Sequence, residues 1–179
     1  MTATDDITIA KLLLAEYDRV KEEQKTRIGF RDNLLYVTLA AMVTVLIGAA
    51  QTRHAELLLA LPAATSVLGW TYLVNDEKIT AIGRYIRTDL GPRLSALAGE
   101  PESLFGWETA HRRDTRRAQR KVIQCAVDLT AFAAVPLAAL TVFWVYGAGA
   151  AVPLVISLLE VAAVAALAVQ ITLYADTGP

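Results

Sequence analysis

Four long stretches of this 179-residue sequence are almost entirely apolar, and they limit what the chain can fold into. They are Leu34–Ala50, Leu57–Val74, Val122–Tyr146 and Val152–Tyr174. A helix rises about 1.5 Å per residue, so each stretch can cross a hydrocarbon core about 30 Å thick if its flanks snorkel. A chain this short cannot bury four such helices in a soluble core. We therefore predict an all-α integral membrane protein with four transmembrane helices in two hairpins.

The polar segments define the rest of the predicted organisation. Residues 1–33 are expected to form a cytoplasmic amphipathic helix, 34–74 the first hairpin, 75–121 a cytoplasmic helical basic segment, 122–174 the second hairpin, and 175–179 a short cytoplasmic tail. Further helices are expected over 76–97 and 104–120, with a turn from Gly99 to Pro101 between them. Prolines should bend or break helices, Pro62 in the second span and Gly91-Pro92 in the basic segment.

The amphipathic pattern of the first helix leaves two arrangements open. Its apolar stripe recurs at spacings of three and four residues, and comprises Leu13, Tyr17, Val20, Gln24 and Ile28. No proline separates this helix from the first span, so the two can form one long helix. The stripe then either lies against the basic segment of its own chain or packs against copies of itself in an oligomer.

Basic residues predict the orientation. Sixteen of the 17 Lys and Arg residues lie in segments 1–33 and 75–121, and only Arg53 lies in a hairpin turn. Because positively charged loops stay in the cytoplasm, we expect both termini inside, both short turns outside, and insertion in the bacterial inner membrane. A single cysteine, Cys125, excludes an intramolecular disulfide, and no catalytic or metal-binding motif is present. We expect no enzyme activity, cofactor or metal.

Glu160 lies eight residues into the fourth apolar stretch. A carboxylate there costs a few kcal/mol and usually faces a bundle interior or a water-filled cavity. A helix places it on one polar stripe, together with Ser157, Leu167, Gln170 and Tyr174. The stripe either lines a water-filled path, or Glu160 is neutral or bonded to Thr141 or another group of its own chain.

Asp128 lies about two turns inside the third stretch. Folding the second hairpin about Gly149 sets it level with Gln170, so a hydrogen bond between the two is one account. The other is an inner acidic ring that selects cations, with Lys121 and Gln124 on the same face. We therefore name Asp128, Ser157, Glu160 and Gln170 as candidate pore-lining residues.

The basic block, defined here as residues 111–121, enters the third stretch directly. Its charges either hold anionic lipid headgroups, at about 1 kcal/mol each near the surface, or bind a phosphate-bearing ligand in an oligomeric ring. The candidate ligand-binding residues are Arg84, Arg87, Arg112, Arg113, Arg116 and Arg117.

The stretch from Glu22 to Leu35, which reads EEQKTRIGFRDNLL and enters a span directly, resembles the start of small actinobacterial membrane proteins. The general plan is similar to that of membrane effectors in phage-defence operons, such as the Hailong type. The resemblance implies an oligomeric channel gated from the cytoplasm, with an operon-encoded nucleotidyltransferase as partner and a nucleotide signal as input.

These patterns together predict a homo-oligomeric ion channel in the lipid bilayer, gated by a nucleotide or oligonucleotide at its cytoplasmic helices and active in antiviral defence. Two other functions stay open. One is a non-conducting membrane scaffold or accessory subunit. The other is a small proton-coupled transporter that uses Glu160 as its proton carrier, against which the lack of a visible inverted repeat counts.

Overall fold

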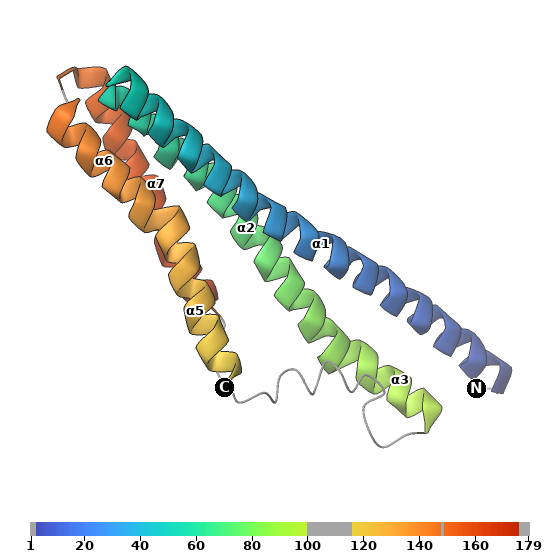
Figure 1. Cartoon of the computed structure of the whole chain (residues 1–179). Helices are drawn as coiled ribbons and strands as arrows, with labels where there is room; N and C mark the ends of the chain where they lie inside the picture. The colour runs from blue at the N-terminus through green and yellow to red at the C-terminus, as the bar shows by residue number, and fades with distance from the viewer. Residues whose placement is uncertain (1–2, 100–115, 148, 176–179) are drawn as a thin grey trace. The chain divides into compact units, whose positions relative to one another are not determined.

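The computed structural model describes residues 3–99, 116–147 and 149–175, and the regular elements in these ranges are all helical (Figure 1). The α-helices are α1 (Ala3–Thr52), α2 (Ala60–Tyr85), α3 (Gly91–Ala98), α5 (Arg117–Leu129), α6 (Val135–Tyr146) and α7 (Ala151–Tyr174). The short elements are a 3₁₀ turn, η1 (Ala55–Leu59), and two π-helical turns, η2 (Ile86–Leu90) and η3 (Thr130–Ala134).

The all-α prediction is confirmed for the described residues. Four helical stretches are long and apolar enough to cross a membrane: 8–52, 55–98, 119–146 and 151–174. The amphipathic helix and the first apolar stretch form one continuous helix, α1, as the absence of proline between them allows. Insertion of these helices in a bilayer as two hairpins stays a prediction. Most of the helix expected over 104–120 lies outside the described residues.

Each π-helical turn precedes a proline by two residues. Pro92 follows η2 and Pro136 follows η3. A proline ring clashes with the carbonyl four residues earlier, which belongs to Thr88 or Phe132, both inside the π turns. Widening the turn relieves the clash without ending the helix. The break considered at Gly91-Pro92 is therefore absorbed by η2, and the chain stays helical to Ala98, where Gly99 ends α3 in the left-handed region at φ 70°.

The chain divides into two compact units, and the first comprises Met1–Phe30 and Asn75–Arg117. There the start of α1 packs antiparallel to the end of α2 and to the helical turns that follow it. Leu13 of α1 forms a small core with Leu90 and Leu94, flanked by Ile9, Tyr17 and Tyr85. Hydrogen bonds extend the pairing: the Gln24 side chain donates to the Ile79 carbonyl at 3.2 Å, and Arg27 donates to Asn75 Oδ1 at 3.3 Å.

The stripe predicted for α1 packs along its own chain. Leu13 is buried, and Tyr17, Val20 and Gln24 are half-buried, whereas Ile28 is 38% exposed. Arg27 lies on the covered face where Ile28 was expected. Positions on that face are separated by alternating steps of three and four residues, so two successive four-residue steps move a side chain off the face. The structure thus bears out the first of the two arrangements, and packing between copies stays a prediction.

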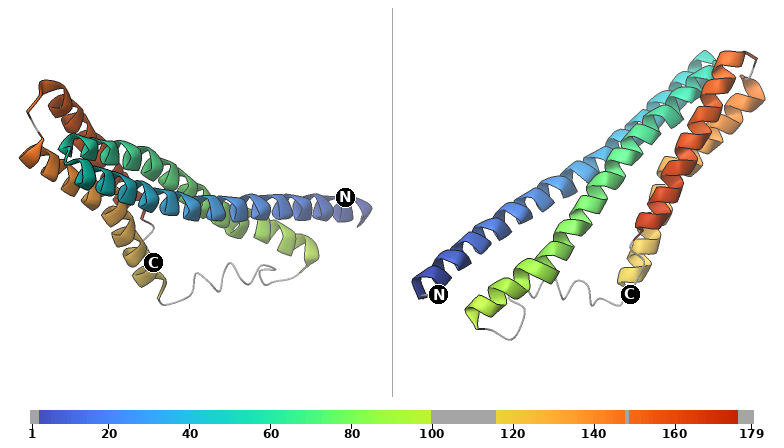
Figure 2. Two further views of the ribbon diagram at one scale, coloured as in Figure 1. Left: turned by 45° about the horizontal axis from the view of Figure 1, so that its top comes forward. Right: turned by 180° about the vertical axis from the view of Figure 1, so that it is seen from behind.

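The second unit comprises Arg31–Val74 and Ala118–Pro179. Its core gathers side chains from α1, η1, α2, η3, α6 and α7 around Phe132 and Phe143, both fully buried. Helices α6 and α7 run side by side (Figure 2). Gly69 on α2 allows the closest approach, because a Cβ there would lie 2.6 Å from Leu167 and 2.7 Å from the Phe132 ring. Helices α2 and α7 and turn η3 therefore meet at one point.

Candidate functional site

One face of α7 is buried inside the second unit and carries polar groups among apolar ones. The buried residues recur every three or four positions, as expected for one face of an α-helix. They are Ser157, Glu160, Val164, Leu167 and Ile171. Of the stripe predicted from sequence, the structure buries Ser157, Glu160 and Leu167. Gln170 is half-buried and Tyr174 is 50% exposed, so the inner end of the stripe turns away from the core.

The Glu160 carboxyl group is buried without a complete set of partners. The residue is 9% exposed, and its Oε2 atom is fully enclosed and has no hydrogen-bond partner among the described residues. Thr141, considered above as a partner, is exposed, and its hydroxyl donates to the Leu137 carbonyl at 2.9 Å. A buried polar atom left unpaired costs about 1–3 kcal/mol. Glu160 is therefore the group of this face that most requires water, a proton or an ion.

A second enclosed oxygen without a partner in the described chain is Ser66 Oγ on α2. Ser66 precedes Gly69 by one helical turn, and Gly69 is the point at which α2 contacts Leu167 of α7. Glu160 precedes Leu167 by two turns. The two unpartnered oxygens thus belong to helices that contact each other. The sequence offered no reason to single out Ser66, because a serine in an apolar helix usually bonds to its own backbone.

Ser157 is satisfied within the chain. Its hydroxyl accepts a hydrogen bond from Trp144 Nε1 at 2.9 Å and donates to the Leu154 carbonyl at 2.7 Å. The bond joins α6 to α7 close to the turn between them. Ser157 therefore has a structural role already. Only the remaining lone pair of its hydroxyl oxygen is free to face a polar path.

Asp128 belongs to a polar cluster that joins α2 to α5. It is 8% exposed, and side-chain hydrogen bonds connect Tyr72 to both Asp128 and Gln124. Arg31 of α1 lies close enough to act electrostatically on Tyr72. The phenol can donate only one proton, so it donates to the carboxylate and accepts from the Gln124 amide. Sequence analysis placed Gln124 on the same face as Asp128 but did not identify Tyr72 as a partner.

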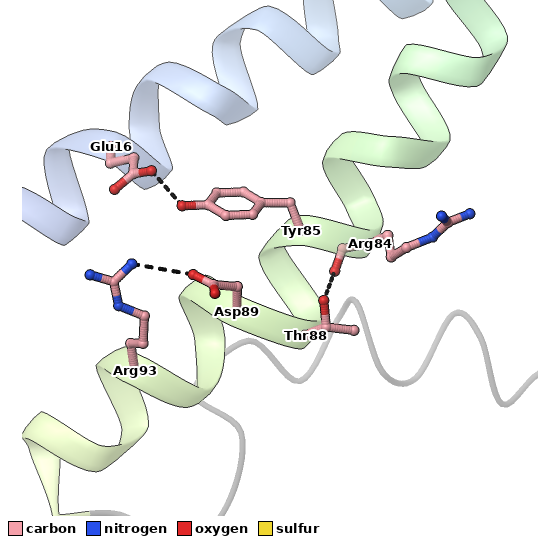
Figure 3. Close-up of polar contacts among 6 residues, drawn as sticks. All are labelled: Glu16, Arg84, Tyr85, Thr88, Asp89 and Arg93. Atoms are coloured by element: carbon pink, nitrogen blue, oxygen red, sulfur yellow. Dashed lines mark hydrogen bonds and ion pairs between the residues drawn. The ribbon is translucent and has the colours of Figure 1, made fainter.

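The candidate phosphate-binding arginines are only partly described. Arg84 and Arg116 are exposed, Arg87 is half-buried, Arg112 and Arg113 lie outside the described residues, and the side chain of Arg117 does so too. Figure 3 shows Arg84 pointing away from the polar group around Tyr85. The role of these arginines as a ligand site stays a prediction.

The polar group around Tyr85 ties the first unit together (Figure 3). The Tyr85 hydroxyl donates to Glu16 Oε1 at 2.5 Å, and Arg93 pairs with Asp89 at 3.2 Å one turn along the same helical stretch. The hydrogen bond to Glu16, followed by partial burial and the negative charges of Glu16 and Asp89, raises the pKa of the Tyr85 phenol. The arrangement fixes α1 against α2.

No family model, curated protein or solved structure matches this chain. The class of protein is therefore assigned from the sequence and the structure alone. It is an all-helical protein with four helices suited to a membrane, and it carries buried polar groups on α2, α5 and α7.

Proposed function

We propose that this protein is an ion-conducting membrane effector of the bacterial inner membrane. Its four apolar helical stretches cross the bilayer, both termini lie in the cytoplasm, and the protein assembles as a homo-oligomer. Its input is a nucleotide or oligonucleotide that binds the basic segment, and its role is antiviral defence. The observation that carries the ion-conducting part is Glu160, a buried carboxyl group with an unpartnered oxygen in an apolar helix.

Two features support the orientation. The basic residues gather in segments 1–33 and 75–121, as above. The turn before α2 and the turn before α7 also lie at the same end of the second unit, since a Cβ on Gly147 would lie 2.9 Å from Ala55 Cβ. Two turns that pack together must share one side of a membrane. This arrangement is the one that the positive-inside rule requires.

The position of the polar groups favours a path inside each subunit. Ser157, Glu160 and Asp128 are buried by the helices of their own chain and do not face outward toward another copy. A shared central pore would have to be lined by exposed side chains instead. We therefore assign the conduction path to the interior of the four-helix unit, and oligomerisation to assembly and gating.

A non-conducting scaffold is the second candidate function, and two hydrogen-bonded groups favour it. Ser157 is bonded to Trp144, and Asp128 belongs to the cluster around Tyr72. Both are explained as structural groups that fix helices to one another in lipid. Glu160 is the group that this explanation does not cover, because its Oε2 has no partner among the described residues.

The test is ion flux through vesicles that contain purified wild type, Glu160→Gln or Glu160→Leu. If the carboxylate attracts cations in the path, the Gln variant should reduce cation flux roughly tenfold, the equivalent of about 1.4 kcal/mol. The Leu variant should abolish flux, because an apolar group dewets the path. Thr141→Val is the matched control, since this exposed hydroxyl bonds only to its own helix in the structure. Equal flux in all four proteins would remove Glu160 from the conduction path. No flux in any of them under an activating nucleotide would instead support the scaffold.

A further inference from the structure

A hollow of about 710 Å³ lies at the end of the second unit, where the turn before α2 meets the turn before α7. Arg53, His54 and Glu56 line it from the first turn, and Trp144, Tyr146 and Gly147 line it from the end of α6. None of these residues takes part in the conduction path or in the basic segment. The hollow therefore needs an explanation of its own.

The hollow is built on a fixed backbone. Gly147 closes α6 with a 2.7 Å hydrogen bond from its N–H to the Phe143 carbonyl, and it packs directly on Ala55. Arg53 has φ 57°, the only positive φ of a non-glycine residue in the described chain. A left-handed arginine is strained, and such strain persists where the surrounding structure requires it. These contacts set the backbone positions from which the lining side chains extend.

The charged and histidine residues near the two turns all line the hollow. Between residues 34 and 74 the sequence contains only three charged or histidine side chains, Arg53, His54 and Glu56, and between 129 and 159 it contains none. All three line the hollow and are exposed. Their side chains form no ion pair or hydrogen bond with another described residue. A lone anion would meet Glu56 and a lone cation would meet Arg53, so the pattern suits a ligand that carries both charges.

The aromatic side chains favour an amphipathic ligand. Trp144 and Tyr146 both line the hollow; the Trp144 N–H is already bonded to Ser157 and the residue is 39% exposed, while Tyr146 is 79% exposed. Aromatic faces attract ammonium groups. Apolar side chains continue from the hollow onto the outer helix faces, with Val145 66% and Val152 70% exposed. A headgroup seated in the hollow could extend its acyl chains over these faces.

We propose that this hollow binds the headgroup of a zwitterionic phospholipid. The phosphate lies against Arg53 and His54, and the ammonium group lies between Glu56 and the aromatic rings of Trp144 and Tyr146. The proposal rests on the membrane insertion included in the proposed function, and it does not depend on ion conduction. Failure of insertion is seen separately, because the protein would then fail to float with vesicles in a density gradient.

The test measures lipid retained by the purified full chain after extraction from vesicles of equal phosphatidylethanolamine and phosphatidylglycerol. The wild type should retain phosphatidylethanolamine at least fivefold over phosphatidylglycerol, which lacks the ammonium group. Glu56→Gln should remove that preference, and Arg53→Gln should lower retention of both lipids. Arg19→Gln, which changes an exposed arginine of α1 outside the basic block, is the matched control and should leave the ratio unchanged.

Both test variants alter exposed side chains, so each should keep the melting temperature of the wild type, and that measurement accompanies the lipid assay. Equal retention of the two lipids by the wild type, or an unchanged ratio in Glu56→Gln, would overturn the proposal. Competition with water-soluble glycerophosphoethanolamine distinguishes a lipid ligand from a soluble one. If it displaces the retained lipid at equimolar concentration, the ligand is a soluble zwitterion and the lipid assignment is wrong.

Discussion

Replacing Gly69 with alanine should destabilise the protein, although alanine is the better helix former. The added Cβ would lie 2.6 Å from Leu167 Cδ2, 2.7 Å from Phe132 Cδ1 and 3.0 Å from Phe132 Cγ. Phe132 is fully buried, so its ring cannot swing away into free space. Overpacking of this kind costs about 1–3 kcal/mol, and alanine regains about 0.5–1 kcal/mol of helix stability. These values allow a net loss of about 0–2.5 kcal/mol, and because two buried side chains are met at once we expect about 1–2 kcal/mol.

The assay is thermal unfolding of the detergent-solubilised protein. For a chain of this size, about 1 kcal/mol corresponds to roughly 2–4 °C, so Gly69→Ala should lower the melting temperature by roughly 2–8 °C. The matched control is Gly48→Ala, another glycine in an apolar helix, where a Cβ would meet nothing within 4 Å. The control should keep or slightly raise the melting temperature, because only the helix propensity changes.

A double variant identifies the contact responsible. Leu167→Ala alone leaves a cavity and should cost about 2–5 kcal/mol. It also removes the atom nearest to the new Cβ, so Gly69→Ala should cost less in that background by at least about 0.5 kcal/mol. Additive losses, or a Gly69→Ala variant as stable as Gly48→Ala, would show that α2 and α7 do not meet at this point.

Three further predictions concern topology, the basic block and the first unit. Reporter tags at both chain ends should be cytoplasmic, and a tag found outside would contradict the orientation taken from the basic residues. Replacing the four arginines between 112 and 117 with Gln should weaken nucleotide or oligonucleotide binding and reduce its salt dependence. If the wild type binds neither ligand, the basic block is a contact for lipid headgroups. Tyr85→Phe should lower the melting temperature by roughly 2–4 °C at pH 7, from the loss of about 1 kcal/mol. Because the Tyr85 pKa is raised in the folded state, this stabilisation is complete below pH 10 and is lost as the pH rises through the raised value. The difference between Tyr85→Phe and wild type should therefore shrink in alkali, and a constant difference would assign it to packing.

The sequence alone determined the helices and the places where the chain is apolar. The absence of proline before the first apolar run allowed the amphipathic segment and that run to form one helix, as they do in α1. The spacing of Leu13, Tyr17, Val20 and Gln24 correctly predicted the covered face of that helix, but its extension to Ile28 was wrong. These properties are local, because they depend on the helix period and on the cost of placing a residue in water or lipid.

Only the tertiary structure decided which polar groups meet. Hairpin symmetry set Asp128 level with Gln170, whereas the structure joins it to Tyr72, on a helix of the first predicted hairpin. Hydropathy likewise could not show that Leu167 packs against the backbone at Gly69. It also could not show that Arg53, His54 and Glu56 line the same hollow as Trp144. In an apolar helix nearly every face is equally acceptable to lipid, so rotation about the helix axis is set by close packing between helices, which the pattern of a single helix does not contain.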